Sequence, residues 1–168
     1  VLVGAHSDSL WGKTQLHRHP QIARWWYIDN ATMEVGNAFG GPIYIGIQAG
    51  STLGDFDVTI SNVIKAPRYI HGQTDVYQWQ QQYRNDPAPW AEIGSGQFIL
   101  TVPSHEIRDL DNPEELMDWW DEALGMEHAI YGYLPWPRVE RAVFDAQISA
   151  GWMHSGYPFM AHDLSVAG

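Results

Sequence analysis

The sequence predicts a mixed α/β (α+β) fold, with an antiparallel β-sandwich first and an α/β layer after it. Short β-type runs separated by Gly and Asn turns occupy residues 1–72. Beyond them, helical spacing alternates with strand-like runs, which is typical of helices packed on a sheet. We therefore divide the chain into residues 1–72 and 73–168.

The first part contains a series of short strand-like runs. Residues 1–4 are apolar, and residues 22–28 combine aromatic with β-branched side chains. Residues 42–47 and 57–63 alternate apolar and polar positions after glycine turns. Strands this short, separated by turn residues, favour an antiparallel sandwich.

The second part opens with a predicted helix. Thr74 is a candidate N-cap, and Val76, Trp79 and Tyr83 follow at helical spacing. The Pro-containing residues 86–89 end this helix. A strand is predicted next, over residues 98–102, which are apolar on both faces and so belong in a sheet covered on both sides.

The strongest helix signal begins at Asn112. Asn is a good N-cap, Pro113 suits the first helical position, and Glu115 stands where a capping box needs it. One apolar stripe is predicted on this helix, made of Leu116, Trp119, Trp120, Ala123 and Leu124. After residue 124 the sequence predicts a loop at 135–137, a strand at 142–148, and a new helix opening at 163–168.

Composition excludes several classes of function. The formal net charge is −11, with no clustered Lys/Arg stripe, so nucleic acid is not expected as a partner. There is no Cys, which excludes disulfides, thiolate metal sites and cysteine nucleophiles. No run of 18 apolar residues occurs, so no transmembrane segment is predicted in this chain.

Local motifs predict no catalytic residue and no metal ligand. Of eight His residues only His105 is followed by Glu, and Asp109 stands where an H-E-x-x-H motif needs its second His. Ser155 lies beside a His but not in a G-x-S-x-G turn. The carboxylates from Asp109 to Glu115 are typical of a helix N-terminus. No cofactor is therefore expected in this chain.

Residues 151–160 form the one segment with a candidate site, because large aromatics stand there between glycines and a proline. The segment is either a packed turn or an exposed edge that lines a substrate groove, since extended peptides bind by adding to a sheet edge. Trp152 and Tyr157 offer flat faces for a sugar ring or a peptide. His154 could hydrogen-bond a substrate or act as a structural His.

Several segments together resemble one known family. Residues 88–92, 98–103, 110–121 and 140–149, with the most specific match at 151–158, are similar to the enhancin-like zinc metallopeptidases, peptidase family M-60. Trp152 stands where many bacterial members have Tyr. In this respect the chain is most similar to animal relatives that include ion-channel-associated factors.

The resemblance implies that residues 73–168 are the first half of a zincin-like (gluzincin) α/β domain. Family peptidases hold zinc with an H-E-x-x-H motif and a later Glu. The resemblance places that motif beyond Gly168, so the chain is expected to stop before the zinc helix. Zinc is then expected in the complete domain, and no ligand or catalytic residue carries over to this chain.

Two functions follow from the resemblance. The first is a part of a zinc metallopeptidase domain that acts on glycoproteins such as mucins, inactive as this fragment. The alternative is a non-catalytic module that binds a membrane protein, as channel-associated relatives do, or a glycan. The expected location is secreted or cell-surface, with the cytoplasmic face of the plasma membrane as the alternative.

A third hypothesis, a lectin-like sandwich built on Trp25 and Trp26, agrees less well with strand geometry. Adjacent strand residues point to opposite faces, so these two side chains would not form one platform. Reading the residues that follow in the gene would separate the first two functions. An intact H-E-x-x-H with a later Glu favours the peptidase, and a broken motif favours the binding module.

Overall fold

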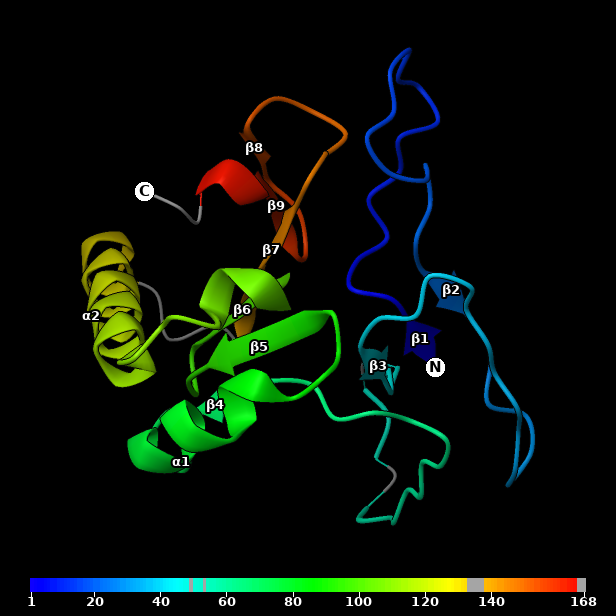
Figure 1. Ribbon diagram of the computed structural model, residues 1–168, viewed down its shortest axis with the longest axis horizontal. Coiled ribbons are helices and arrows are strands. Elements are labelled where there is room, and N and C mark those ends of the chain that lie inside the picture. The colour runs from blue at the N-terminus through cyan, green and yellow to red at the C-terminus, as the bar shows by residue number, and fades with distance from the viewer. Residues whose placement is uncertain (49, 53, 133–137, 166–168) are drawn as a thin grey trace.

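The computed structural model describes residues 1–48, 50–52, 54–132 and 138–165, and it confirms a mixed α/β fold with two sheets (Figure 1). The strands are β1 (Leu2–Val3), β2 (Arg24–Trp25), β3 (Ile43–Tyr44), β4 (Arg68–Ile70), β5 (Trp90–Gly94), β6 (Phe98–Pro103), β7 (Glu140–Asp145), β8 (Met153–His154) and β9 (Phe159–His162). The helices are α1 (Val76–Gln81) and α2 (Pro113–Tyr131), with short 3₁₀ helices η1 (Tyr83–Asn85), η2 (Ser104–Ile107) and η3 (Asp163–Ser165).

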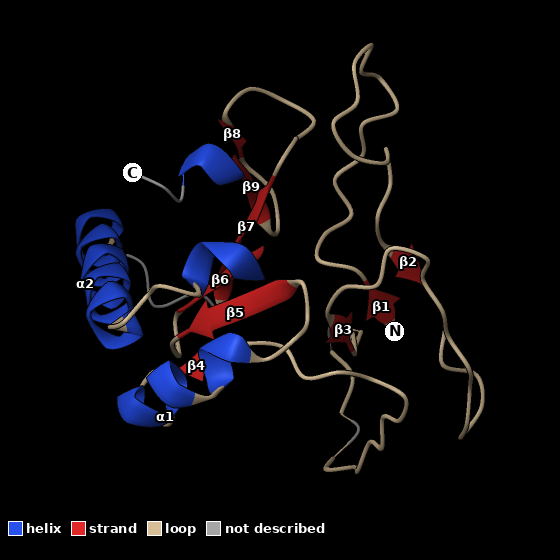
Figure 2. Ribbon diagram, in the orientation of Figure 1, coloured by secondary structure: helices blue, strands red, loops and turns tan. Residues whose placement is uncertain are grey.

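The first part is built around one antiparallel sheet, and loops make up most of the rest (Figure 2). Its order is β2-β1-β3, and each strand pairs over two residues. The runs predicted at 22–28 and 42–47 therefore contribute two paired residues each. The strand predicted at 57–63 is wrong, because the described residues from 54 to 66 contain no strand. Its sequence alternates apolar and polar residues, but no strand of the described residues pairs with it, and all its side chains are exposed.

The second sheet has the order β4-β5-β6-β7-β9-β8. The pairs β4–β5, β6–β7 and β7–β9 are parallel, while β5–β6 and β8–β9 are antiparallel. Figure 1 shows α2 on one side of this sheet and the blue N-terminal segment on the other. The run at 98–102 was predicted to lie in a sheet covered on both faces, and β6 confirms this.

The two faces of the second sheet differ in chemistry. The helix side is apolar, and there Trp79 of α1 and Met117 of α2 belong to the same buried cluster as Phe98 of β6. The opposite side is mixed, since the buried Arg141 and Asp145 of β7 lie there beside a second, smaller apolar cluster. Alternation along a strand separates these two sets. The N-terminal segment thus covers the face of the sheet that carries the buried charges, and it also contributes to the apolar cluster there.

Helix α1 begins one residue later than predicted. Asp75, not Thr74, is its N-cap, and the Asp75 carboxylate accepts from the Gln78 backbone N–H at 2.9 Å. The hydroxyl of Thr74 instead accepts from the Ile70 N–H at 2.9 Å. Both Thr74 and Asp75 carry an oxygen that could cap the helix. Because the Thr74 hydroxyl accepts from the Ile70 N–H, the Asp75 carboxylate is the cap.

Helix α2 begins as predicted. The Asn112 side chain accepts from the Glu115 N–H at 3.4 Å, and the Glu115 carboxylate accepts from the Asn112 side-chain amide at 3.3 Å. The helix continues to Tyr131 and ends at Gly132, whose φ of 66° suits glycine. The predicted apolar stripe is wrong at Trp119, which is 57% exposed, because the helix buries Met117 instead.

We expect Asn112→Ala to destabilise α2 by about 1 kcal/mol, because an N–H in its first turn loses its acceptor. Amide exchange in this helix of the complete protein should become about fivefold faster. Hydrogen–deuterium exchange followed by mass spectrometry measures this. Asn112→Asp keeps an acceptor oxygen and should leave the rate near its original value. Equal rates for all three proteins would show that Asn112 is not the cap.

The last long strand ends earlier than the sequence predicts. The strand expected at 142–148 is β7, which ends at Asp145, because the side chains there turn to meet the N-terminal segment. The helix expected at 163–168 is described only as η3, over residues 163–165. Its remaining residues lie outside the described part of the chain, as does the predicted loop at 135–137.

Candidate functional site

The segment predicted to carry the site lies at an edge of the second sheet. Strand β8 is the last strand in the sheet order and pairs on one side with β9. Gly151, with φ of 57°, precedes β8, and Gly156, with φ of 147°, turns the chain toward β9. These values are rarely adopted by other residues, so the two glycines permit the hairpin.

Two of the three predicted site residues have exposed rings. Trp152 is 54% exposed and stacks on His162, with ring centroids 4.8 Å apart. Tyr157 is also exposed, and its hydroxyl donates to the Val139 carbonyl at 2.9 Å. The guanidinium of Arg138 lies 3.8 Å from the centre of the Tyr157 ring. The two aromatic rings are therefore held in place while part of each stays open to solvent.

The third residue, His154, is half-buried and hydrogen-bonded. Its Nδ1 donates to the Ser155 carbonyl at 3.0 Å, and its Nε2 is hydrogen-bonded to the Ser149 hydroxyl at 3.1 Å. Nε2 also lies 3.5 Å from a carboxylate oxygen of Asp8. These contacts fix the ring in one orientation.

Asp8 brings the N-terminal segment to this edge. One of its carboxylate oxygens accepts from the Ser149 N–H at 2.7 Å. Burial acts to raise the pKa of Asp8, but the hydrogen bonds from Ser149 and the nearby His154 outweigh it and hold the pKa below its usual value. Asp8 is therefore a stable anion that fixes the segment leading into β8.

A buried ionic cluster extends this contact to the end of β7. His6 is fully buried, and the Asp8 N–H donates to its Nδ1 at 3.1 Å. The ring proton must then be on Nε2, which donates to Asp145 at 2.8 Å. Arg18 forms an ion pair with the same carboxylate. We call His6, Asp8, Arg18 and Asp145 the joint cluster, because it links the N-terminal segment to the second sheet.

A second polar contact links the two sheets. Buried Arg141 donates to the Thr101 hydroxyl at 3.0 Å and to the Ala5 carbonyl at 2.8 Å. It also donates to the Tyr44 hydroxyl, which donates to Glu92 at 2.5 Å. Burial first, and then the Glu92 charge, raise the pKa of Tyr44. Its hydroxyl therefore stays protonated and bridges Arg141 to Glu92.

Sequence reasoning missed both contacts. His6 and Asp145 are separated by 139 residues, and no short motif connects them. One signal was present, since Asp145 is a charged residue inside the strand predicted at 142–148. A charged residue inside a strand-like run requires a buried partner. The sequence does not say which partner it has.

The described residues offer no zinc site. No group of three or more His, Asp or Glu side chains within them is placed to hold a metal ion. His105 lies in η2 with its side chain largely exposed, 3.0 Å from the Glu106 carboxylate. This pair does not fit the tetrahedral zinc sites of proteins, so we derive no step through zinc.

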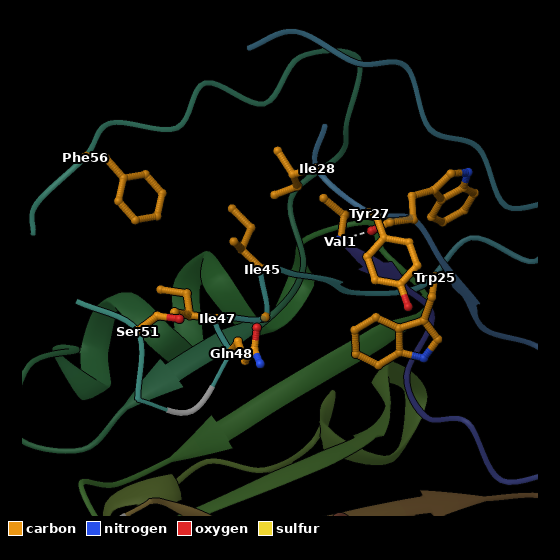
Figure 3. Close-up of a pocket in the computed structure, with 11 residues that line it drawn as sticks. Val1, Trp25, Tyr27, Ile28, Ile45, Ile47, Gln48, Ser51 and Phe56 are labelled. Atoms are coloured by element: carbon orange, nitrogen blue, oxygen red, sulfur yellow. Dashed lines mark hydrogen bonds between the residues drawn. The ribbon is translucent and has the colours of Figure 1, made fainter. Parts of the chain in front are cut away.

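A separate apolar cavity of about 680 Å³ lies in the first part (Figure 3). Trp25 and Tyr27 line it from one strand region, and Ile45, Ile47 and Phe56 line it from the loops. The described lining contains no Asp, Glu, His, Lys or Arg. The cavity therefore offers apolar contact area and no group for acid–base chemistry.

Family models match the whole chain in two parts. Residues 62–168 match peptidase M60, enhancin and enhancin-like, and residues 1–61 match the N-terminal domain of M60-like peptidases. The chain belongs to the enhancin-like M60 family. This confirms the family that the sequence resembles. The division after residue 72 stays a prediction, and β4 at 68–70 already pairs with the second sheet.

Among curated proteins, this M60-family chain is similar to the TRPM8 channel-associated factors. It is 44% identical to the TRPM8 channel-associated factor homolog of Xenopus laevis over 96% of its length. It is 39% identical to TRPM8 channel-associated factor 2 of Bos taurus over 98% of its length. The chain spans 18% of the length of these relatives.

Among solved structures, the chain is similar to the ZmpB metallopeptidase from Clostridium perfringens. The TM-score is 0.50 at 11% identity, over 60% of this chain and 24% of that one. An identity this low shows a shared fold and nothing finer. No helix among the described residues has the length and apolar character needed to cross a membrane.

Proposed function

We propose that the complete protein is a channel-associated factor, in which this chain binds an extended segment of the channel along strand β8. The observation that carries the proposal is the similarity to TRPM8 channel-associated factors, which extends over nearly the whole chain. That similarity includes both the N-terminal part and the M60-like part. A membrane channel is accordingly the proposed partner.

The geometry of β8 supports peptide binding. The His162 N–H donates to the Trp152 carbonyl at 3.0 Å, so these two residues form a hydrogen-bonded pair. In an antiparallel ladder the next pair is not hydrogen-bonded, which turns the backbone groups of Met153 away from β9. Within the described residues no strand pairs with this open side. An extended peptide can add there as a further strand.

The side chains around β8 supply apolar contact area. Trp152 and Tyr157 expose part of their rings, and Met153 is 63% exposed. In β-strand addition, backbone hydrogen bonds give affinity and side-chain contacts give specificity. The joint cluster holds the base of this hairpin through Asp8 and Ser149. The edge is therefore firm before a partner arrives, which limits the entropy lost on binding.

A second candidate is peptidase activity on glycoproteins such as mucins. The family model and the fold shared with a metallopeptidase favour it. Zinc would then be held by other residues of the complete protein, since the described ones offer no ligand set. Cleavage of a mucin-type glycoprotein by the complete protein, abolished by a chelator, would establish this candidate. Intact glycoprotein under conditions that support channel binding would count against it.

We expect Met153→Pro to weaken channel binding by about tenfold or more, because proline removes the N–H that faces the open side. Met153→Leu keeps this N–H and a similar apolar volume, so it should bind nearly as well. Tyr157→Ala should also weaken binding, since it removes one exposed ring. The measurement is co-purification of the complete protein with a TRPM8-type channel in detergent.

Hydrogen exchange in β9 monitors folding in the same variants. Weaker binding with unchanged exchange in β9 supports the edge as the binding site. If the Pro and Leu variants bind equally, backbone pairing at β8 plays no part. If binding falls only as exchange in β9 rises, residues 151–160 are a packed turn, which is the other alternative that the sequence allows.

A further inference from the structure

Helix α2 has a second apolar surface that the core does not use. Its inner side packs on the sheet through residues that include Met117, Trp120 and Leu124. The exposed fractions of Trp119, Met126 and Ile130 are 57%, 56% and 82%. A helix that packs on one sheet needs one apolar side. The exposed side chains therefore call for a separate explanation.

These side chains follow a heptad repeat. Trp119, Ala123, Met126 and Ile130 are spaced by four, three and four residues, which is the spacing of a and d positions in a coiled coil. We call these four residues the outer seam. On a helix such positions fall in one narrow stripe, and this one is about 16 Å long. Figure 1 shows α2 at the periphery of the molecule, on the side of the sheet away from the N-terminal segment.

Carboxylates border the outer seam on both sides. In the same heptad register, Glu115 and Glu122 occupy g positions and Glu127 occupies an e position, and all three are exposed. None of the three forms an ion pair among the described residues. The sequence 113–131 contains no Lys or Arg. Side chains at e and g set the choice of partner through their charge.

We propose that the outer seam binds one amphipathic helix of a partner protein, with apolar residues at its a and d positions and Lys or Arg at e and g. Apolar contact with Trp119, Met126 and Ile130 supplies affinity, and the three glutamates select the basic partner. A second copy of this chain would bring the glutamates of two outer seams together, and each chain has a net charge of −11. An anionic membrane surface would be repelled in the same way.

This inference does not depend on the proposed function, because α2 and β8 share no residue. Two labelled synthetic helices test it against the complete protein. Both are about four heptads long with the same Leu and Ile seam, and they carry either Lys or Glu at every e and g position. Fluorescence anisotropy should show the Lys peptide binding about tenfold or more tightly than the Glu peptide.

Variants locate the binding site. Met126→Gln with Ile130→Gln should weaken binding of the Lys peptide by about tenfold or more. The matched control is Val58→Gln with Ile60→Gln, which changes two exposed apolar residues in the first part of the chain and should not alter binding. Glu122→Lys with Glu127→Lys should reverse the preference between the two peptides.

Three results would overturn the proposal. The first is equal affinity for both peptides, or binding that survives the Met126 and Ile130 change. The second is a dimer of the complete protein, seen by light scattering, that the same change dissociates, since the occupant is then a second copy. The third is no peptide binding together with protection of Met126 from peroxide oxidation, since the seam is then covered by the protein itself.

Discussion

Replacing Arg141 with Met is expected to lower the free energy of unfolding by about 3–5 kcal/mol, the usual loss when one partner of a buried ionic contact is removed. Met fills a similar volume, so the change tests the charge and its hydrogen bonds. The substitution leaves the Ala5 carbonyl and the Thr101 hydroxyl without their donor. Unpaired buried polar groups of this kind are destabilising.

The loss is expected where the two sheets meet. Tyr44 of β3 reaches Arg141 of β7 and Glu92 of β5 through one hydroxyl. Without the guanidinium, Tyr44 would have only the Glu92 carboxylate as a partner. Amide exchange in β1 and β3 of the complete protein should therefore become on the order of a hundredfold faster. Exchange in β6, which lies deep in the second sheet, should change less.

Arg138→Met is the matched control for Arg141→Met. Arg138 forms an exposed ion pair with Glu140 at 3.3 Å, and such pairs contribute about 0–1 kcal/mol. Its replacement should leave exchange in β1 and β3 unchanged. If the two variants behave alike, the buried contacts of Arg141 do not hold the sheets together.

Elements specified by local chemistry were predictable. Asn112 and Pro113 mark the start of α2, and the start agrees because capping depends on residues within one turn. The strand at 98–102 agrees for a similar reason, since its apolar character on both faces requires burial on both sides. The C-terminal end of α2 was not predicted, although Gly132 marks it.

The first part of the chain was less predictable because its strands depend on distant partners. Residues 57–63 alternate as a strand should, but alternation records which side chains share a face and not whether a partner is present. The same limit applies to the joint cluster. Its members are far apart in sequence, so only the folded chain brings them together.

The segment that carries the candidate site was predicted from its amino-acid composition, and the structure adds the contacts of its side chains. Glycines and large aromatics singled out 151–160, and the structure places this segment at a sheet edge. The role of each side chain in binding stays a prediction. For His154, the contacts with Ser149 and Ser155 show how the ring is held, which the sequence alone left open.

The joint cluster leads to the second large effect, expected for Asp145→Ala. Asp145 is the carboxylate shared by His6 and Arg18, and its side chain is 8% exposed. Its removal leaves the buried Arg18 guanidinium with only the more distant Asp8 carboxylate, 3.8 Å away, as a counter-charge, and it leaves the buried His6 N–H without an acceptor. We expect a loss of about 3–5 kcal/mol in the free energy of unfolding.

Asp145→Asn separates shape from charge. The amide oxygen can still accept from His6 Nε2, while Arg18 loses the nearer of its two negative partners, so the loss should be smaller than for Ala. Asp111→Ala is the surface control, because Asp111 pairs with Arg84 at 2.7 Å while 76% exposed. That change should alter stability by about 1 kcal/mol or less.

The Asp145 variants also connect stability with the proposed binding edge. The Asp8 carboxylate accepts from the Ser149 N–H and faces His154, and it lies 3.8 Å from the Arg18 guanidinium. If Asp145→Ala frees Arg18, exchange should rise in β8 as well as in the N-terminal segment, because both are held by the same cluster. Channel binding should then weaken with no change to any residue of β8. Faster exchange confined to the N-terminal segment, with binding intact, would mean that the edge is held by its own hairpin alone.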